Sequence, residues 1–327
     1  MVLKKSPLSF AKMAIAKFLT VLMLMEVIVS DYQFGAVDGL NMDYYQMTCP
    51  VAEMIVKYTV NRALQNDPTL AAALVRMHFH DCFIEGCDGS ILIDSTKDNT
   101  AEKDSPGNLS LRGYEVIDDA NEQLEQQCPG IVSCADIVAM AARDAVFWAG
   151  GPAYDIPKGR MDGRRSKIED TINLPFPSNS SQLIRAFGQR GFSVQEMVAL
   201  SGAHTLGVAR CSSFKARLGN ADTTLDSDFA KTLSKTCSAG DNAVQPFDDT
   251  QNTFDNFYYY TLLRQNGLLF SDQQLYISPM TNFIVNAYAM NQQMFFFDFQ
   301  QAMVKMGILD VKDGSKGEVR QNCRKVN

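Results

Sequence analysis

The segment 76–90 restricts the fold more than any other part of the sequence. It reads RMHFHDCFIEGCDGS and follows an uncharged apolar run, 70–75, so it predicts the end of a buried helix that leads at once into a loop. Arg76 and His80 are four residues apart and share one face of that helix. Together they can stabilise developing negative charge and move a proton. By spacing alone, a surface arginine beside a core histidine is the commoner interpretation, so the remaining sequence must decide.

The loop after this helix is rich in oxygen donors. Its candidate side-chain donors are those of Asp81, Asp88 and Ser90. Closely spaced hard oxygen donors on a glycine-containing loop suit calcium, and carbonyl groups between them add to the set. A bridge between Cys82 and Cys87 would hold the loop closed before an ion binds. The alternative is a solvated acidic turn, which is common for one aspartate but less so for this set beside a disulfide.

The segment 1–30 has the profile of a secretory signal. A basic start precedes the apolar stretch 18–25, which is too short to span a bilayer. Counted over 14–29 it could act as an anchor, although charged residues interrupt it, and we expect cleavage within 30–39. The net charge of −7 argues against partners such as nucleic acid or an anionic membrane surface.

The sequence contains eight cysteines, all beyond this signal. In an oxidising compartment, an even number of cysteines suggests a framework of disulfides. Eight cysteines allow 105 pairings, and the spacing favours only the local pair Cys82–Cys87. Zinc is the competing interpretation, but there is no Cys-x-x-Cys motif and only three histidines are present.

Apolar residues recur at helical spacing along the chain, and no alternating run of any length appears, which predicts an all-α fold. Ser133 is expected to cap one helix, and Ser193 with Glu196 forms a capping box before another. The irregular segment 157–177 is expected to connect two halves. The expected helices span about 50–66, 70–80, 114–127, 134–149, 181–190, 194–205 and 281–306.

The positions of the three histidines suggest a cofactor. His204 ends an apolar helix beside small residues that leave room for a flat ligand, although such a histidine alone is more often part of a core. His78 points about 200° away from His80 around the helix, so it cannot share that face. A haem between two helices needs one imidazole on the iron and, for peroxide chemistry, a proton shuttle with a cationic partner on the other face. His204 and the Arg76/His80 pair would supply that set.

With these pieces in order, the chain resembles the secretory plant-type (class III) haem peroxidases over essentially its whole length after the signal. The motifs that carry the resemblance are RMHFHDCFIEGCD from Arg76, NLSLRGY from Asn108, VSCAD from Val132, VALSGAHTLG from Val198, FDNFYY from Phe254 and SDQQL from Ser271. Several such motifs in the right order, with eight cysteines placed among them, make chance agreement negligible.

The resemblance implies an all-α fold in which two helical domains enclose haem b, with few or no short strands. The peroxidase domain would span 40–327, with a distal half at about 40–160 and a proximal half at about 175–310. The implied enzyme is a secreted monomer of the cell wall that reduces hydrogen peroxide and oxidises phenolic donors in one-electron steps through a ferryl intermediate. No vacuolar tail is expected after Asn327, and neither nucleic acid nor a membrane is an expected partner.

The resemblance also implies roles for individual residues around the haem. His80 would move a proton between the peroxide oxygens, Arg76 would stabilise the leaving oxygen, Asn108 would hydrogen-bond His80, and Phe79 would line the pocket. On the other face, His204 would bind the iron and Asp272 would accept its other N–H. Pro175 would lie at the exposed haem edge, where reducing substrates donate electrons.

Two calcium sites are implied. The distal ligands would be Asp81, Ile84, Gly86, Asp88 and Ser90, with Glu102 nearby through water. The proximal ligands would be Thr205, Asp248, Thr250, Thr253 and Asp255. In the family the first proximal aspartate usually stands where this sequence has Phe247, and Asp248 is the expected substitute.

The family pairing of cysteines would give Cys49–Cys128, Cys82–Cys87, Cys134–Cys323 and Cys211–Cys237. Two glycosylation sequons are present, at Asn108 and Asn179. Only Asn179 lies in an evidently exposed polar stretch, so it is the expected glycan site. The family role of Asn108 argues against a glycan there.

Two other classes of protein fit parts of this pattern. One is a secreted, calcium-binding wall protein that keeps the fold without catalysis, and loss of Arg76, His80 or His204 would favour it. All three residues are present. The other is a haem enzyme of catalase or oxidase type, which would release oxygen from peroxide without a donor.

Overall fold

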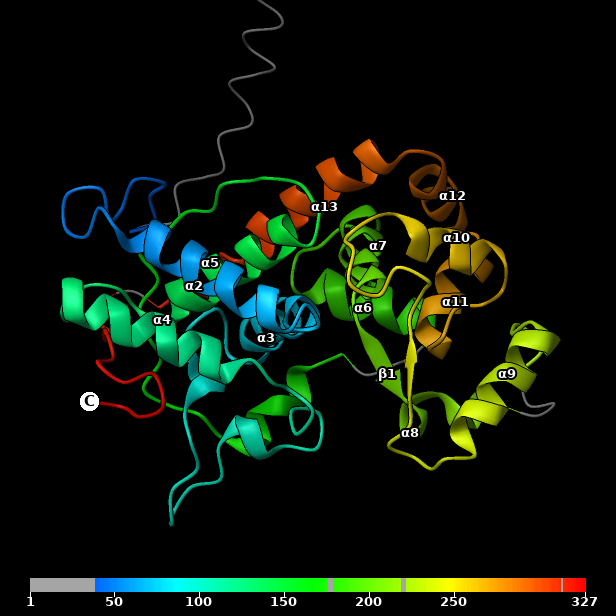
Figure 1. Ribbon diagram of the computed structural model, residues 1–327, viewed down its shortest axis with the longest axis horizontal. Helices are drawn as coiled ribbons and strands as arrows, with labels where there is room; N and C mark the ends of the chain where they lie inside the picture. Colours follow the sequence, from blue (N-terminus) through cyan, green and yellow to red (C-terminus); the bar gives the residue numbers. More distant parts are fainter. Residues whose placement is uncertain (1–38, 176–178, 219–221, 313) are drawn as a thin grey trace, which may run out of the picture. The chain divides into compact units, whose positions relative to one another are not determined.

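The computed structural model describes residues 39–175, 179–218, 222–312 and 314–327 (Figure 1). The expected secretory signal lies outside the described residues. Leu40–Asn327 forms one compact unit. Among the described helices, none is both long enough and apolar enough to cross a membrane.

Helices dominate the described chain, which confirms the all-α prediction. The α-helices are α2 (Ala52–Asn66), α3 (Leu70–Ile84), α4 (Tyr114–Gln127), α5 (Cys134–Trp148), α6 (Ser180–Gln189), α7 (Val194–Ser201), α8 (Cys211–Phe214), α9 (Ser227–Cys237), α10 (Phe257–Leu263), α11 (Phe270–Ile277), α12 (Asn282–Met290) and α13 (Gln292–Met306). Short 3-10 helices are η1 (Ser90–Leu92), η2 (Glu102–Asp104), η3 (Ile168–Asn173), η4 (Gly202–Thr205) and η5 (Lys215–Arg217).

Two short strands, β1 (Val208–Arg210) and β2 (Val244–Pro246), form an antiparallel pair with Ala209 opposite Gln245. The pair borders a small hydrophobic cluster that includes Phe214. So little sheet agrees with the expectation of few or no short strands.

Local sequence explains where several helices begin. The Ser193 side chain accepts a hydrogen bond from the amide of Glu196, whose carboxylate accepts one in return, so the predicted capping box at α7 is confirmed. Ser133 caps α5 by a single bond, in which its side chain accepts from the amide of Asp136. α5 is buried on nearly all sides, as its continuous apolar sequence predicts.

Three expected helix boundaries were wrong. α3 continues to Ile84 instead of ending near His80, so Asp81 lies on the helix and not in the loop. The helix expected to reach Thr205 gives way after Ser201 to η4. A Cβ atom at Gly202, the first residue of η4, would lie 2.4 Å from the Tyr259 hydroxyl, so only glycine fits there.

The single helix expected over 281–306 is two helices. Asn291 separates α12 from α13 with an extended backbone (φ −144°, ψ 92°), and its side chain accepts a hydrogen bond from the amide of Met294. An asparagine can replace the lost helical bonds in this way, because its short side chain reaches the first amides of the next helix.

The helices pack in two groups (Figure 1). In the first group, α5 packs against α2, α3 and α4; in the second, α7 packs against α6, α12 and α13, and α10 packs against α11 and α12. One hydrophobic core runs through both groups. α3 also contacts η4, so the two elements that carry the histidines of the predicted site meet.

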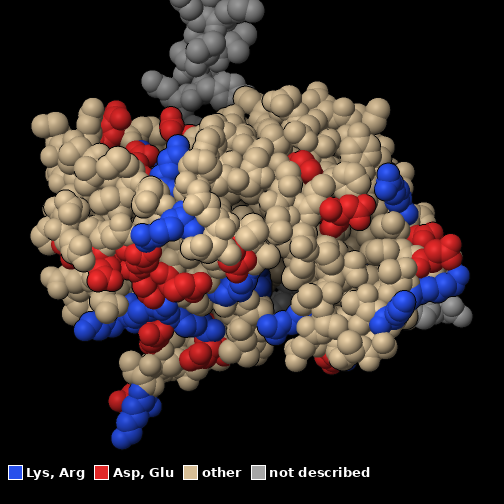
Figure 2. Space-filling model, in the orientation of Figure 1, with Lys and Arg blue, Asp and Glu red and all other residues tan. Residues whose placement is uncertain are grey.

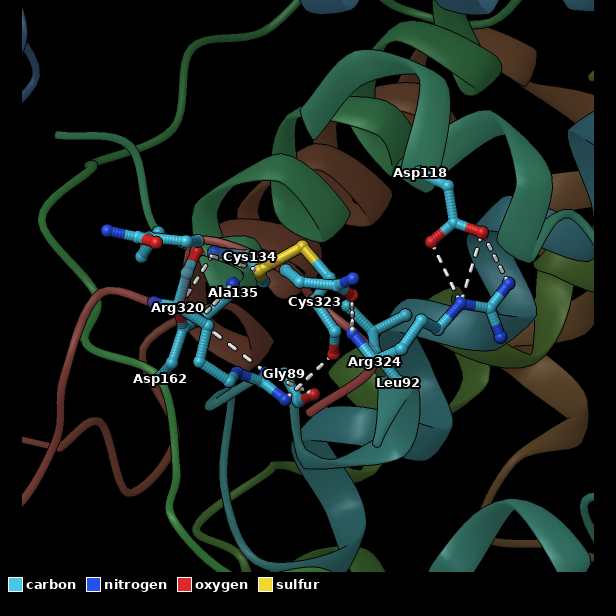
Figure 3. The surroundings of a disulfide bond; sticks show 12 residues. Gly89, Leu92, Asp118, Cys134, Ala135, Asp162, Arg320, Cys323 and Arg324 are labelled. Carbon is cyan, nitrogen blue, oxygen red and sulfur yellow. Dashed lines mark hydrogen bonds and ion pairs between the residues drawn. A yellow bond between two sulfur atoms is a disulfide. The ribbon is translucent and has the colours of Figure 1, made fainter. Parts of the chain in front are cut away.

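The structure contains the four disulfides that the resemblance implied. Figure 3 shows the surroundings of Cys134–Cys323, where Asp162 accepts hydrogen bonds from the first amides of α5 and from the amide of Arg320. The fully buried guanidinium of Arg320 donates to the carbonyl of Gly89, at 2.6 Å. The C-terminal segment is therefore tied to both the start of α5 and the oxygen-rich loop.

Candidate active site

α3 is buried except along one narrow face. Its half-buried residues are Ala72, Arg76 and Phe79, while the other residues of the helix are buried. Their spacing of four and three places them in one row along the helix. An apolar helix that leaves such a row accessible presents a surface to a ligand and not to the core.

His80 is held in one orientation by two neighbours. Its Nδ1 lies 2.6 Å from Asn108 Oδ1, and Asn108 Nδ2 donates to the carbonyl of Glu102 at 2.8 Å. The second bond fixes which end of the amide faces the ring, so His80 Nδ1 carries the proton and donates it. Arg76 Nε donates to His80 Nε2 at 3.1 Å. The Nε2 lone pair is therefore the basic position of the ring.

The charges of this pair are set by burial. Burial and the neighbouring Arg76 cation lower the pKa of His80 to about 3, against the smaller opposing effect of Asn108. The imidazole is thus a neutral base near pH 7. Burial also lowers the pKa of Arg76, but an arginine remains charged. The guanidinium is held by Ser110 Oγ and the carbonyl of Gly107, both at 2.9 Å.

His204 lies in η4 with its Nδ1 2.8 Å from Asp272 Oδ1. Asp272 is buried, whereas the His204 side chain is 37% exposed. Because Nδ1 must carry the proton to bind a carboxylate, the lone pair of Nε2 is free for a metal ion. The ring stacks on Phe247, with 4.3 Å between centroids and 6° between planes, which fixes its tilt.

The two sides fit a flat cofactor between them. Ala72 lies against Gly207, where a Cβ atom would come within 2.7 Å of the Ala72 methyl group, so the chain near His204 approaches α3 closely. Ala203 and Phe79 are half-buried and offer a small and an aromatic contact. Figure 2 shows a hollow between α3 and β1, with Lys and Arg side chains at its edge. An imidazole with a free Nε2 is one of the axial ligands that hold haem iron in proteins.

Three carboxylates, from the end of α3, the oxygen-rich loop and η2, meet in the interior. Asp81, Asp88 and Glu102 are almost fully buried, and Ser90 Oγ lies 3.2 Å from Glu102 Oε2. Burial and the neighbouring carboxylates raise the pKa of Asp81 to about 8 and that of Glu102 to about 9. Glu102 Oε1 is buried without a hydrogen-bond partner. A bound cation would neutralise this cluster in place of the protons that the raised pKa values imply, and oxygen donors of this kind suit calcium.

The carbonyl of Ile84 is less available than expected. It accepts hydrogen bonds from Asn173 Nδ2 at 3.0 Å and from Arg190 Nη2 at 3.2 Å. Within the described residues, no group of three or more His, Cys, Asp or Glu side chains could hold a metal ion by itself. A calcium ion at the loop would therefore need the Ser90 hydroxyl and carbonyls such as that of Gly86 as well.

The second expected calcium set converges in part. Thr205 Oγ1 lies 2.8 Å from Asp248 Oδ2 and 3.0 Å from Asp255 Oδ1. Thr250 Oγ1 lies 3.0 and 3.1 Å from the same two carboxylates. Burial raises the pKa of Asp248 to about 6. Thr253 is exposed, and its amide donates to the carbonyl of Thr250.

Comparison with known proteins identifies the family. The family model described as peroxidase matches residues 56–291. Peroxidase 47 of Arabidopsis thaliana is 70% identical over 317 residues, which cover 97% of each chain. Peroxidase 64 of the same plant is 49% identical over 89% of this chain and 94% of its own. Peroxidase 4 of Vitis vinifera is 46% identical over 88% and 92%.

The chain is a class III plant peroxidase. As a member of this family it is a haem enzyme that uses hydrogen peroxide to oxidise a reducing substrate. Membership of this family argues against the alternative of a wall protein without catalytic activity. The residues on which that alternative depended, Arg76, His80 and His204, lie on two elements that contact each other.

Two neighbours of the peroxidase site were not expected from the sequence. Phe247 marked a departure from the family pattern, and the structure places its ring on His204. The shift of one residue thus leaves Asp248 beside the threonines. Tyr258 donates its hydroxyl to Asp272 Oδ1 at 2.9 Å. Tyr258 is part of the FDNFYY motif, but nothing local in the sequence shows which carboxylate accepts its hydrogen bond.

The remaining predicted residues of the peroxidase lie as follows. Pro175 is half-buried and directly precedes the undescribed segment 176–178. His78 is buried and points about 200° away from His80 around α3, and its Nδ1 lies 3.5 Å from the sulfur of Cys82. It takes no part in the site.

The two sequons differ in access. Asn108 is buried, with both ends of its amide bound. Asn179 is exposed and caps α6 through Oδ1, which accepts from the amide of Gln182. Its Nδ2, the atom that carries a glycan, is left out of that bond.

Proposed function

We propose that this peroxidase activates hydrogen peroxide between Arg76 and His80 and oxidises small phenolic donors in one-electron steps. The observation that supports this most is the pair of hydrogen-bonded sets on contacting elements: His80 with Arg76 and Asn108 on one side, and His204 with Asp272 on the other. Each set alone could simply stabilise the fold, but the two sets together fit the two faces of a haem.

On the α3 side, His80 acts as the acid and base. Its Nε2 would take a proton from one oxygen of hydrogen peroxide and return it to the other, which leaves as water when the O–O bond breaks, while haem would supply the two electrons that this cleavage consumes. The Arg76 guanidinium stabilises negative charge on the departing oxygen. Asn108 keeps the ring in the tautomer that leaves Nε2 basic.

On the other side, His204 would hold haem b through Nε2. The haem supplies an iron that exchanges electrons with peroxide and with the donor. Asp272 accepts a hydrogen bond from Nδ1 and would thereby increase electron donation by the imidazole. Phe247 keeps the ring in place by stacking.

Two calcium ions are part of the proposal. The carboxylates of Asp81 and Asp88, with Ser90 and the carbonyls of Ile84 and Gly86, would hold one, with Glu102 as an outer partner. The second would be held by Asp248, Asp255 and the threonines of that cluster. The buried, uncompensated carboxylate oxygen of Glu102 supports the first site most directly.

Phenolic donors would give up electrons near Pro175, at an accessible haem edge that accounts for broad donor specificity. The four disulfides support a secreted, extracellular enzyme, because such bonds persist in oxidising compartments. The exposed sequon at Asn179 is the proposed glycan site. We propose that the enzyme acts as a monomer.

The absorption spectrum of the purified protein tests the proposal. A Soret band should be present, should shift on addition of one equivalent of hydrogen peroxide and should return when guaiacol is added. A Soret band that does not respond to peroxide would refute the role of Arg76 and His80. Release of oxygen without a donor would point instead to a catalase.

A further inference from the structure

The carboxylate of Asp272 accepts hydrogen bonds from two donors besides His204. Oδ1 accepts from His204 Nδ1 at 2.8 Å and also from the Tyr258 hydroxyl at 2.9 Å. Oδ2 accepts from the amide of Leu269 at 2.9 Å. Two donors therefore compete for the one oxygen that faces His204.

We propose that Tyr258 is a positioning residue that limits how strongly Asp272 draws the proton of His204, and thereby sets electron donation from His204 to the haem iron. The proposal rests on the proposed function, because it takes His204 as the iron ligand. It concerns the strength of that ligand and not its presence.

The physical argument is one of shared negative charge. A phenol hydroxyl that donates to Oδ1 stabilises charge on that oxygen and makes it a weaker acceptor for the imidazole N–H. Tyr258 and Asp272 are 1% and 2% exposed, so water does not replace or screen this bond. Without the hydroxyl, Asp272 would pull harder on the Nδ1 proton, and His204 would gain imidazolate character.

The tyrosine ring is fixed by packing and not by its hydroxyl alone. It meets the His204 ring edge to face, at 5.9 Å and 84°, and the Tyr259 ring at 5.2 Å. Replacement by phenylalanine keeps these contacts and removes only the donor. The hydroxyl is thus the one group on α10 that can change the charge on Asp272 without changing its surroundings.

The adjacent residue provides a matched control. Tyr259 lies on the same helix, is fully buried, and donates its hydroxyl to the carbonyl of Val198 at 2.9 Å, away from Asp272. Tyr259→Phe therefore also removes a buried tyrosine hydroxyl, but it leaves the hydrogen bond between His204 and Asp272 unchanged.

The experiment uses the haem-loaded enzyme as wild type, Tyr258→Phe and Tyr259→Phe. Resonance Raman spectra of the ferrous state give the iron–histidine stretching frequency, and a redox titration gives the Fe(III)/Fe(II) midpoint potential. Tyr258→Phe should shift the frequency upward and the potential downward, because a more anionic imidazole binds iron more strongly. Tyr259→Phe should leave both at the wild-type values.

Equal values in wild type and Tyr258→Phe would overturn the proposal. So would equal shifts in both variants, which would indicate a packing effect, or loss of haem from Tyr258→Phe alone, which would give the hydroxyl a role in retention. Failure of the proposed function looks different, because the wild type itself would then lack an iron–histidine band.

Discussion

At His80, one imidazole is held between an amide oxygen and a guanidinium, and its Nε2 is left as a base. Replacing His80 with leucine should slow peroxide activation by about 10²- to 10⁴-fold, since general acid–base catalysis typically contributes that much. Stopped-flow measurement of the Soret shift gives the rate, and the band itself reports that haem is still bound.

The same substitution at His78 is the control. His78 is buried on the same helix but faces away from the site. His78→Leu should keep the wild-type rate of peroxide activation. A His80→Leu variant that reacts as fast as wild type would remove His80 from the mechanism.

The pH dependence follows from the protonation state of His80. In the proposed mechanism, activation needs the neutral imidazole, and burial with the neighbouring Arg76 lowers the pKa of His80 to about 3. Above that value the base is free, and below it the base is protonated and inactive. The rate constant for peroxide should therefore be flat between about pH 5 and pH 8 and should fall only as the pH approaches 3. A fall centred near pH 6.5, the ordinary pKa of histidine, would contradict this.

The sequence suggested candidate residues for the site, but it did not show which of them contact each other. Arg76 and His80 are recognisable because a local helix sets their separation. His204 and Asp272 are 68 residues apart, and their pairing depends on how η4 meets α11. The contact of Phe247 with His204 has the same origin, since packing and not local spacing determines it.

At the scale of elements, the oxygen-rich loop and the base are connected by η2. Glu102 faces Ser90 with its carboxylate, and its carbonyl accepts from Asn108, which holds His80. Removing the proposed calcium ion with EGTA should disturb this connection and slow peroxide activation by about 10- to 100-fold, the loss typical when a residue that supports a metal ligand is removed. Stopped-flow rates on treated and untreated enzyme measure it.

Calcium should restore the rate, and magnesium should not, because magnesium requires a smaller octahedral site. Asn108→Val provides the control. This variant lacks the connection and should already be slow, so EGTA should change its rate little. Equal sensitivity in Asn108→Val and wild type would mean that calcium acts by another route.

Helix existence was predictable from apolar periodicity, but helix ends were less so. The break at Asn291 carries no proline or glycine, and the apolar pattern continues across it, so the sequence favoured one long helix. The extension of α3 to Ile84 was missed because polar residues suggested a helix end where the helix in fact continues. Polar residues such as Asp81 suggested a loop, whereas the helix buries them.

At the scale of the molecule, Cys134–Cys323 closes the longest loop, with a sequence separation of 189. In the chain-entropy model its removal should cost about 5 kcal/mol of unfolding free energy, against about 3.5 kcal/mol for Cys211–Cys237, whose separation is 26. Urea denaturation of the two double-alanine variants measures both losses. A larger loss for the Cys211–Cys237 pair would show that local strain, and not loop length, dominates.

The bonds around Arg320 also affect how the protein can be made. Gly89 precedes Arg320 by 231 residues. Asp162, which binds the first amides of α5, also accepts from the amide of Arg320. In a chain emerging from the ribosome, the residues of α2 to α5 are therefore synthesised long before the C-terminal residues that bond to them. The Cys134–Cys323 disulfide and the hydrogen bonds of Arg320 can therefore form only after nearly the whole chain has been translated.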